Sequence, residues 1–230
     1  MIRNLKKLIL FLCLLLLSFF SHAENRFYIQ GQINTVMPGD VDSKAYSGTV
    51  DGVVFSNLKA SFDFDNSTTG GIEIGFKNIY DTNFRAGLQY IAPEFEFNKL
   101  DVSTTATING TNYNIGATYS RSDATTDSLN LDIDAKMLFL NVYYDFAGYW
   151  DTFVPFLGIG AGIADYKGVD AKEPAIAGMV GFKKYIDDNK QLYFGHKSTY
   201  TRSSGPELDG GLKFEDVEFY TATFQIGYEF

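Results

Sequence analysis

The stretch 218-EFYTATFQIGYEF-230 alternates between two kinds of side chain and ends on an aromatic residue. One set of alternate positions is apolar: Phe224, Ile226, Tyr228 and Phe230. The positions between them are polar or small: Gln225, Gly227 and Glu229. Alternation of this kind predicts a β-strand with two unlike faces. Because the alternation continues to the last residue, we expect this strand to be paired along its whole length. We also expect the side chain of Phe230 to have a structural role at the end of the strand.

Seven other stretches repeat this pattern, each with one apolar face: residues 26–35, 71–77, 83–90, 136–146, 155–164, 175–184 and 191–198. The second face carries many glycines, which weaken a strand interior unless space is tight. A narrow barrel interior supplies such tight space, whereas an open sandwich does not. The polar residues on this face are therefore predicted to face a lumen: Glu73, Lys77, Arg85, Gln89, Lys183, Lys197 and Glu229.

The strand lengths and connections favour a barrel that crosses a membrane. A tilted membrane strand needs about 9–11 residues, and backbone groups in lipid must all be paired, so the sheet has to close. The apolar faces end in aromatic residues, as a girdle at a lipid boundary would. The connections alternate between short and long. We predict an all-β, eight-stranded, antiparallel, up-and-down transmembrane barrel with long extracellular loops and both termini in the periplasm.

The first 23 residues have the pattern of a secretory signal peptide. Basic residues precede the apolar run 8–20, and small residues lead to a predicted cleavage after Ala23. We expect residues 24–230 to form one outer-membrane barrel domain. Three of the 19 basic residues lie in the leader and no acidic residue does, so 16 basic residues remain against 28 acidic ones. A net charge of −12 argues against a nucleic-acid partner, whose binding surface would be basic.

Two long connections, residues 36–69 and 91–134, are rich in small polar residues. The pair Asn109-Gly110 is a strong hairpin signal, and it predicts a ribbon that projects beyond the membrane. Alternatively, the same segment adds two strands to the barrel. The long connections are acidic, so they could recruit divalent cations or a basic partner. The simpler interpretation is a solvated surface beside anionic lipopolysaccharide.

The order of four stretches resembles that of a known family. MLFLNVYYDF, FVPFLGIGAGIA, QLYFGHKS and TFQIGYEF together are similar to the small eight-stranded outer-membrane barrels of Gram-negative bacteria, of the opacity-protein and OmpA-transmembrane type within the porin superfamily. The resemblance implies a C-terminal signal for the barrel assembly machinery, carried by Phe224, Ile226, Tyr228 and Phe230. It also implies lipid and lipopolysaccharide as surroundings, and a monomer. The second long connection and the GHKS segment depart from the family pattern.

Two non-enzymatic functions fit this reading. The first is a structural or surface-interaction role, in which the barrel anchors loops that contact an unidentified extracellular partner. Eight strands leave an interior that side chains just fill, which favours this role. The second is a narrow, porin-like channel for small or apolar solutes, lined by Phe139, Tyr143 and Met179. The alternative for these three residues is that they plug the lumen.

A third hypothesis is an enzyme. His196 and Ser198 share one face of a strand, and such a pair can activate a hydroxyl nucleophile when an acid orients the histidine. The pair resembles the lipid A deacylase barrels, but Thr199 stands where that family has asparagine. The acids considered for the third role are Glu207, Asp209 and Glu215. We expect no catalytic role, no cofactor and no metal site.

Overall fold

The computed structural model describes residues 26–50, 53–79, 82–126, 132–148, 152–169, 171–207 and 213–230. The predicted signal peptide, residues 1–23 with cleavage after Ala23, lies outside these residues. Within the described ranges, no helix is both long enough and apolar enough to cross a membrane.

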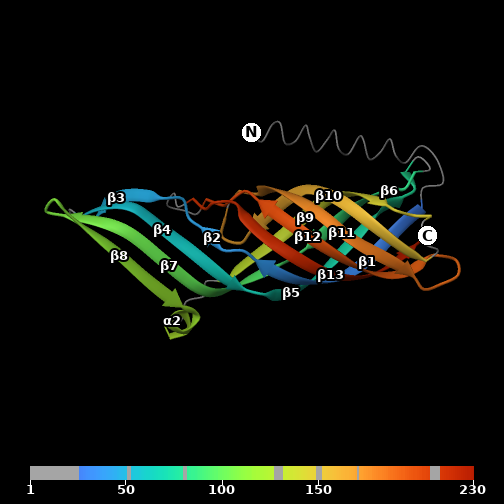
Figure 1. Ribbon diagram of the computed structural model, residues 1–230, viewed down its shortest axis with the longest axis horizontal. Coiled ribbons are helices and arrows are strands. Elements are labelled where there is room, and N and C mark those ends of the chain that lie inside the picture. Colours follow the sequence, from blue (N-terminus) through green and yellow to red (C-terminus); the bar gives the residue numbers. More distant parts are fainter. Residues whose placement is uncertain are drawn as a thin grey trace.

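Eight antiparallel strands form a closed barrel (Figure 1). In ring order they are β1 (Arg26–Pro38), β5 (Ser67–Lys77), β6 (Phe84–Ile91), β9 (Ile133–Asp145), β10 (Phe153–Tyr166), β11 (Glu173–Tyr185), β12 (Leu192–Ser203) and β13 (Val217–Glu229). Each predicted stretch lies on one of these strands, so the eight-stranded fold is confirmed. The register of β1 against β13, from Tyr28↔Glu229 to Pro38↔Phe219, closes the ring.

The outer surface of the barrel is apolar. Residues of the predicted apolar faces are exposed, and Ile159 reaches an exposed fraction of 71%. A closed band of exposed aliphatic side chains is stable only against lipid. Aromatic rings gather at the barrel end that holds the C-terminus, where Phe27 lies 5.5 Å from Phe230 and Phe84 lies 5.3 Å from Tyr144 between ring centroids. We call this end of the barrel the terminal end. The opposite end, from which a second sheet projects, is called the extension end.

A second sheet continues the long axis of the molecule beyond the barrel (Figure 1). Its elements are β2 (Val41–Asp42), β3 (Tyr46–Val50), β4 (Val53–Asp65), β7 (Glu94–Ile108) and β8 (Thr111–Ser120), followed by helix α2 (Arg121–Thr126). The strand order is β3-β4-β7-β8, and β2 pairs with the other end of β4. We call this sheet with α2 the extension.

The extension corrects part of the sequence reading. Residues 36–69 were expected to be a loop, yet β3 and β4 form a hairpin there. A register shift between Ser56 and Lys59 puts one extra residue in β4, which interrupts the period of two that would have indicated the strand. The ribbon at Asn109-Gly110 is confirmed: β7 and β8 pair around this turn, whose two residues have φ of 51° and 80°.

The two strands of the ribbon do not enter the barrel ring. Among the described residues, β7 pairs with the ring only at Glu94↔Asp134 and Phe95↔Ile133 of β9, and β8 pairs only with β7, so the ten-stranded alternative is wrong. The connection between the predicted strands 155–164 and 175–184 is shorter than those strand ends imply. Residues 167–172 link β10 to β11, because both strands extend beyond their predicted ends.

Candidate functional site: the filled lumen

Seven charged side chains are buried inside the barrel. Four are cations and three are anions: Lys77, Arg85, Lys183, Lys197, Glu73, Asp145 and Glu229. The predicted lumen residue Gln89 is buried with them. Asp145 was missing from the predicted set, although it shares the parity of Asn141 and Tyr143 on the same strand. An isolated buried charge is very costly, so these groups have to be paired and hydrogen-bonded.

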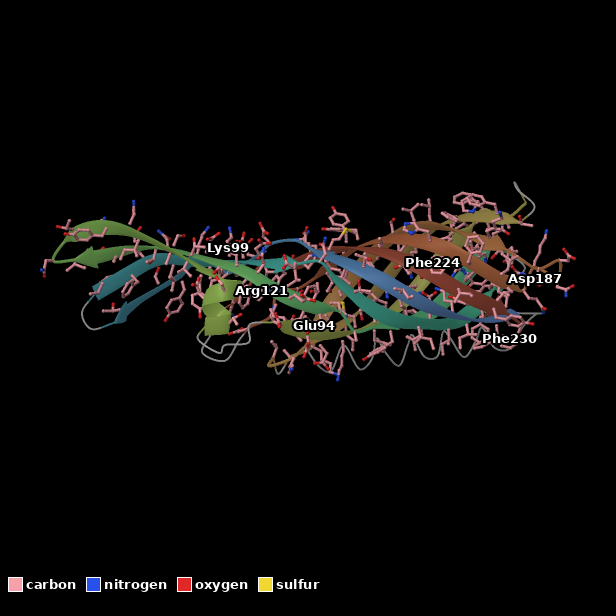
Figure 2. All side chains as sticks on the ribbon, turned by 90° about the horizontal axis from the view of Figure 1, so that it is seen from below. Glu94, Lys99, Arg121, Asp187, Phe224 and Phe230 are labelled. Carbon is pink, nitrogen blue, oxygen red and sulfur yellow. The ribbon has the colours of Figure 1, made fainter. Side chains whose placement is uncertain are left out.

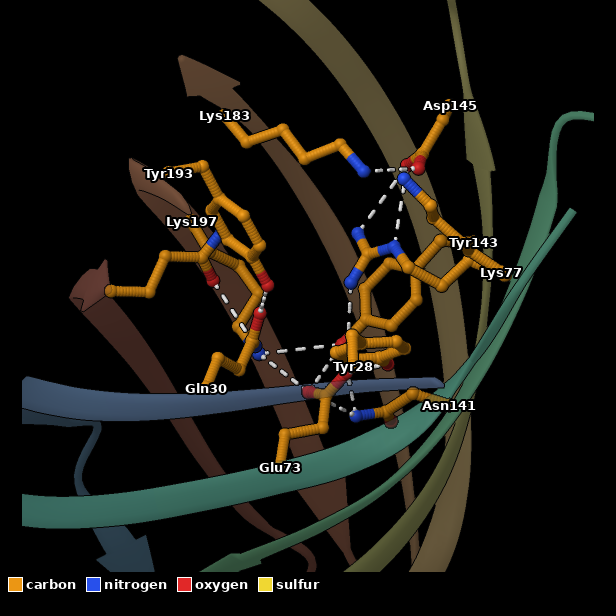
Figure 3. Close-up of polar contacts among 12 residues, drawn as sticks. Tyr28, Gln30, Glu73, Lys77, Asn141, Tyr143, Asp145, Lys183, Tyr193 and Lys197 are labelled. Atoms are coloured by element: carbon orange, nitrogen blue, oxygen red, sulfur yellow. Dashed lines mark hydrogen bonds and ion pairs between the residues drawn. The ribbon is translucent and has the colours of Figure 1, made fainter. Parts of the chain in front are cut away.

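Glu73 on β5 is the centre of the first group (Figure 3). Its carboxylate accepts hydrogen bonds from the hydroxyls of Tyr28 at 2.6 Å and Tyr143 at 2.8 Å. Two cations approach the same carboxylate: Lys197 Nζ at 3.4 Å and Arg85 Nη1 at 3.7 Å. Four partners from four other strands therefore converge on one fully buried acid.

Glu229 and Asp145 form the second group, nearer the terminal end. Glu229 pairs with Lys77 and, at 2.9 Å, with Lys183, and it accepts the Tyr185 hydroxyl at 2.8 Å. Lys183 also reaches Asp145 at 2.8 Å. One lysine thus bridges two acids, so the two anions act as a single unit.

Arg85 joins the two groups. Its Nη2 lies 3.3 Å from Asp145, while its Nη1 faces Glu73. The guanidinium carbon lies 4.0 Å from the ring centroid of Tyr143 and 5.1 Å from those of Tyr28 and Phe156. Arginine suits this position because its planar group pairs with carboxylates and stacks on aromatic rings at once. The result is one continuous charge network across the lumen.

Amide side chains fill the space beside the network. Gln30 Nε2 donates to Gln225 Oε1 at 3.3 Å, and the Tyr193 hydroxyl donates to Gln30 Oε1 at 2.7 Å. Gln89 Nε2 donates to Gln32 Oε1 at 2.7 Å. These contacts add Gln30 and Gln32 to the polar layer, from β1, a strand with no buried charge among its described side chains.

Glycines leave room for these large side chains. A Cβ atom at Gly87 would lie 2.1 Å from the Tyr28 hydroxyl and 2.6 Å from Glu73 Oε1. A Cβ atom at Gly227 would lie 2.4 Å from the Tyr193 hydroxyl. The glycine-rich face therefore matches the bulky face of neighbouring strands, which is how a narrow lumen is filled.

Toward the extension end, apolar side chains take over. Met137, Phe139 and Met179 are buried in one cluster with Tyr143. The cluster continues through Phe95 and the other phenylalanines at the base of the extension. The residues proposed as a channel lining, Phe139, Tyr143 and Met179, therefore pack against one another and their neighbours.

The outward-facing candidates lie elsewhere. His196 Nε2 is 3.1 Å from Ser198 Oγ on the outer face of β12. His196 lies seven residues before Ser203 on β12, which pairs with Val217 at the extension end of the strand. The distance along the strand from His196 to Ser203 is about 24 Å. Glu207 and Glu215 both lie beyond that pair, and Glu207 is 3.1 Å from Lys213. Neither acid is placed to orient His196; Asp209 lies outside the described residues.

The proposed assembly signal lies on the outer face of β13. Its four side chains are exposed: Phe224, Ile226, Tyr228 and Phe230. The Phe230 amide donates to the Phe27 carbonyl at 2.8 Å. Across the described ranges, no group of three or more His, Cys, Asp or Glu side chains is arranged to hold a metal ion.

Known structures share this architecture. Neisserial surface protein A is 11% identical, with 89% of this chain and 97% of that chain covered and a TM-score of 0.51. OprG from Pseudomonas aeruginosa is 18% identical, with coverage of 91% and 97% and a TM-score of 0.48. AlkL is 14% identical, with coverage of 91% and 93% and a TM-score of 0.46. No protein-family model and no curated protein sequence matches the chain.

The likeness to Neisserial surface protein A is one of fold. Together with the closed ring and the exposed apolar band, it defines the class: the chain has the fold of a small eight-stranded outer-membrane β-barrel.

Proposed function

We propose that this protein is a non-conducting, non-catalytic outer-membrane anchor that holds its extension outside the cell, where the extension contacts a partner. The observation that carries this proposal is the filled lumen. A water path would have to separate Glu73 from Arg85 and Lys197, which are buried and paired. Removing one partner from a buried ion network costs about 3–5 kcal/mol, so the closed arrangement is strongly favoured.

The extension supports an interaction role because most of its sheet lies beyond the barrel (Figure 1). Its base pairs with β9 and packs on the barrel, where Phe95 lies 5.6 Å from Phe219 between ring centroids. Beyond that base, β8 carries exposed side chains along most of its length (Figure 2). The connections that form it, residues 39–66 and 92–132, hold 11 acidic and four basic residues. A partner would therefore meet a large, negatively charged surface.

Cysteine labelling in intact cells tests this display. The only cysteine of the sequence is Cys13, inside the predicted signal peptide. We expect Thr111→Cys, at the tip of the ribbon, to react with a membrane-impermeant maleimide. Asp188→Cys, in the turn after β11 at the terminal end, is the matched control and should react only after lysis. The proposed orientation places both termini in the periplasm. Labelling of the control alone in intact cells would contradict that orientation and with it the surface role.

A narrow channel is the second candidate. One observation favours it: Asn141 Oδ1 and Gln225 Nε2 are buried in the lumen without a hydrogen-bond partner among the described residues. Buried polar atoms of this kind are commonly satisfied by water, and a row of waters would begin a path. Conductance measurements separate the two candidates.

A further inference from the structure

Strand β8 is an edge of the extension. Among the strands that the structure describes, it pairs only with β7, from Ile108↔Thr111 to Lys99↔Ser120. In a hairpin with a two-residue turn, the pair that flanks the turn is hydrogen-bonded, and such pairs alternate along the ladder. The odd-numbered residues of β8 therefore bond to β7. The even-numbered ones direct their N–H and C=O groups to the open edge: Asn112, Asn114, Gly116 and Thr118.

This edge lacks the usual protection. Natural edge strands are blunted by lysine, proline, bulges or short length. β8 is ten residues long, contains no proline and no charged residue, and pairs with β7 without a register shift. Only its end is capped, where the Ser120 amide donates to Asp123 at 2.8 Å. The open stretch between Asn112 and Thr118 spans about 20 Å.

The two faces beside this edge differ. On one face the odd-numbered residues of β8 are Tyr113, Ile115 and Ala117, and the first two are large, apolar and exposed. On the other face, Asn112 and Asn114 accept hydrogen bonds from threonines of β7, at 2.7 Å and 3.1 Å. An added strand would fit best if apolar residues alternated with polar ones.

A second copy of this chain in the same membrane does not fit the edge. In both copies β8 would run from the tip back toward the barrel, so two neighbouring β8 strands would be parallel. A two-fold axis along the membrane normal would also place the apolar face of one sheet beside the polar face of the other. The excess of acidic residues in the extension adds repulsion between copies.

We propose that the open edge of β8 binds an extended, basic segment of another protein by strand addition. This proposal rests on the proposed function, because the segment is supplied from outside the cell. Main-chain hydrogen bonds to Asn112, Asn114, Gly116 and Thr118 provide the contact, as in other strand-addition complexes. Charge selects the partner. Asp123, beside the edge, has its pKa held below the ordinary value by hydrogen bonds from Ser120 and is ionised at neutral pH.

Amide hydrogen exchange on the full chain, refolded in lipid nanodiscs, tests the proposal. The probe is a ten-residue peptide in which valine alternates with lysine and threonine. We expect it to slow exchange at least tenfold at Asn112, Asn114, Gly116 and Thr118. Exchange at Tyr113, Ile115 and Ala117, already bonded to β7, should stay unchanged. Protection at other sites, or none, would overturn the proposal.

Gly116→Pro removes one outward donor and should weaken peptide binding at least tenfold without disturbing the ladder to β7. Thr49→Pro, on β3 at the opposite edge of the same sheet, is the matched control and should leave the affinity unchanged. Equal affinity for the Gly116→Pro variant would contradict strand addition, and equal affinity for a glutamate version of the peptide would contradict the charge selection.

Protection of the four amides that rises with protein concentration, without peptide, would assign the edge to a second copy. Since these signals come from β8 alone, they are independent of the orientation and conductance tests.

Discussion

The barrel and the extension are both antiparallel sheets, yet they treat polar groups in opposite ways. In the barrel, closure removes every edge and turns the polar face inward, so Glu73, Asp145 and Glu229 are buried and must be paired. In the extension, the sheet stays open, its ion pairs such as Lys99–Asp101 are exposed to water, and β8 pairs with β7 alone among the described strands. Figure 2 shows both regions along one axis. Closure of the sheet therefore fixes the side chains of the lumen, whereas the open sheet of the extension keeps its strand edge available for contact.

The largest expected effect comes from removing the central lumen acid. Glu73→Gln leaves Arg85 and Lys197 with one anionic partner fewer in a buried site, so we expect a loss of about 3–5 kcal/mol in the free energy of unfolding. Urea unfolding in lipid vesicles measures it. Asp101→Asn, which breaks an exposed pair in the extension, should leave barrel unfolding unchanged. An equal loss of unfolding free energy in the two variants would contradict the difference between the two regions.

Filling the lumen from the glycine side should have the next largest effect. A methyl group at Gly87 collides with the Tyr28 hydroxyl, whereas nothing lies within 4 Å of a Cβ at Gly178, on the outer face. Overpacking costs about 1–3 kcal/mol. We expect Gly87→Ala to lose that much in the same unfolding assay and Gly178→Ala to lose nothing. An unchanged free energy of unfolding in Gly87→Ala would contradict the tight packing of Tyr28 and Glu73 against Gly87.

A smaller and purely local effect is expected at the ribbon tip. Gly110 has φ of 80°, a conformation that costs a residue with a side chain about 1 kcal/mol. Gly110→Ala should speed amide exchange near Ile108 and Thr111 while barrel unfolding stays the same. Gly116→Ala, where φ is not positive and the nearest atom lies 3.7 Å away, is the control. A change in barrel stability would show that the two regions are coupled.

The smallest effect concerns pH at the end of β8. Hydrogen bonds from Ser120 lower the pKa of Asp123 below its ordinary value. Because the folded pKa is depressed, the cap is fully present above the unfolded pKa and is lost as the pH falls through the folded value. The Ser120 amide signal should therefore titrate with a midpoint below that of an aspartate in an unfolded chain. Asp123→Asn should abolish that titration; a midpoint no lower than that of an aspartate in an unfolded chain would contradict the cap.

The barrel was predictable from sequence because lipid and lumen impose unlike chemistry on alternate residues. All eight strands follow that rule, as the terminal strand from Phe224 to Phe230 does. Asp145 was not predicted, although parity alone would have identified it, since one residue separates it from Tyr143 on the same lumen face. The hairpin of β3 and β4 was missed, because a register shift between Ser56 and Lys59 breaks the period.

The pairing within the lumen could not be predicted from the sequence. Which cations reach Glu73 depends on the stagger of eight strands around the ring, and Lys197 lies 124 residues away along the chain. Likewise, no local pattern indicates that Arg85 lies between Tyr28 and Tyr143. Such contacts follow from closure, which is a property of the whole sheet.

Single-channel conductance of the refolded chain, residues 24–230, in a planar bilayer tests the central claim most directly. A lumen filled by the Glu73 network and the apolar cluster beyond it predicts no resolvable current at any salt concentration. Discrete, salt-dependent openings would show a continuous water path. They would contradict the anchor proposal and make the channel the function of the barrel.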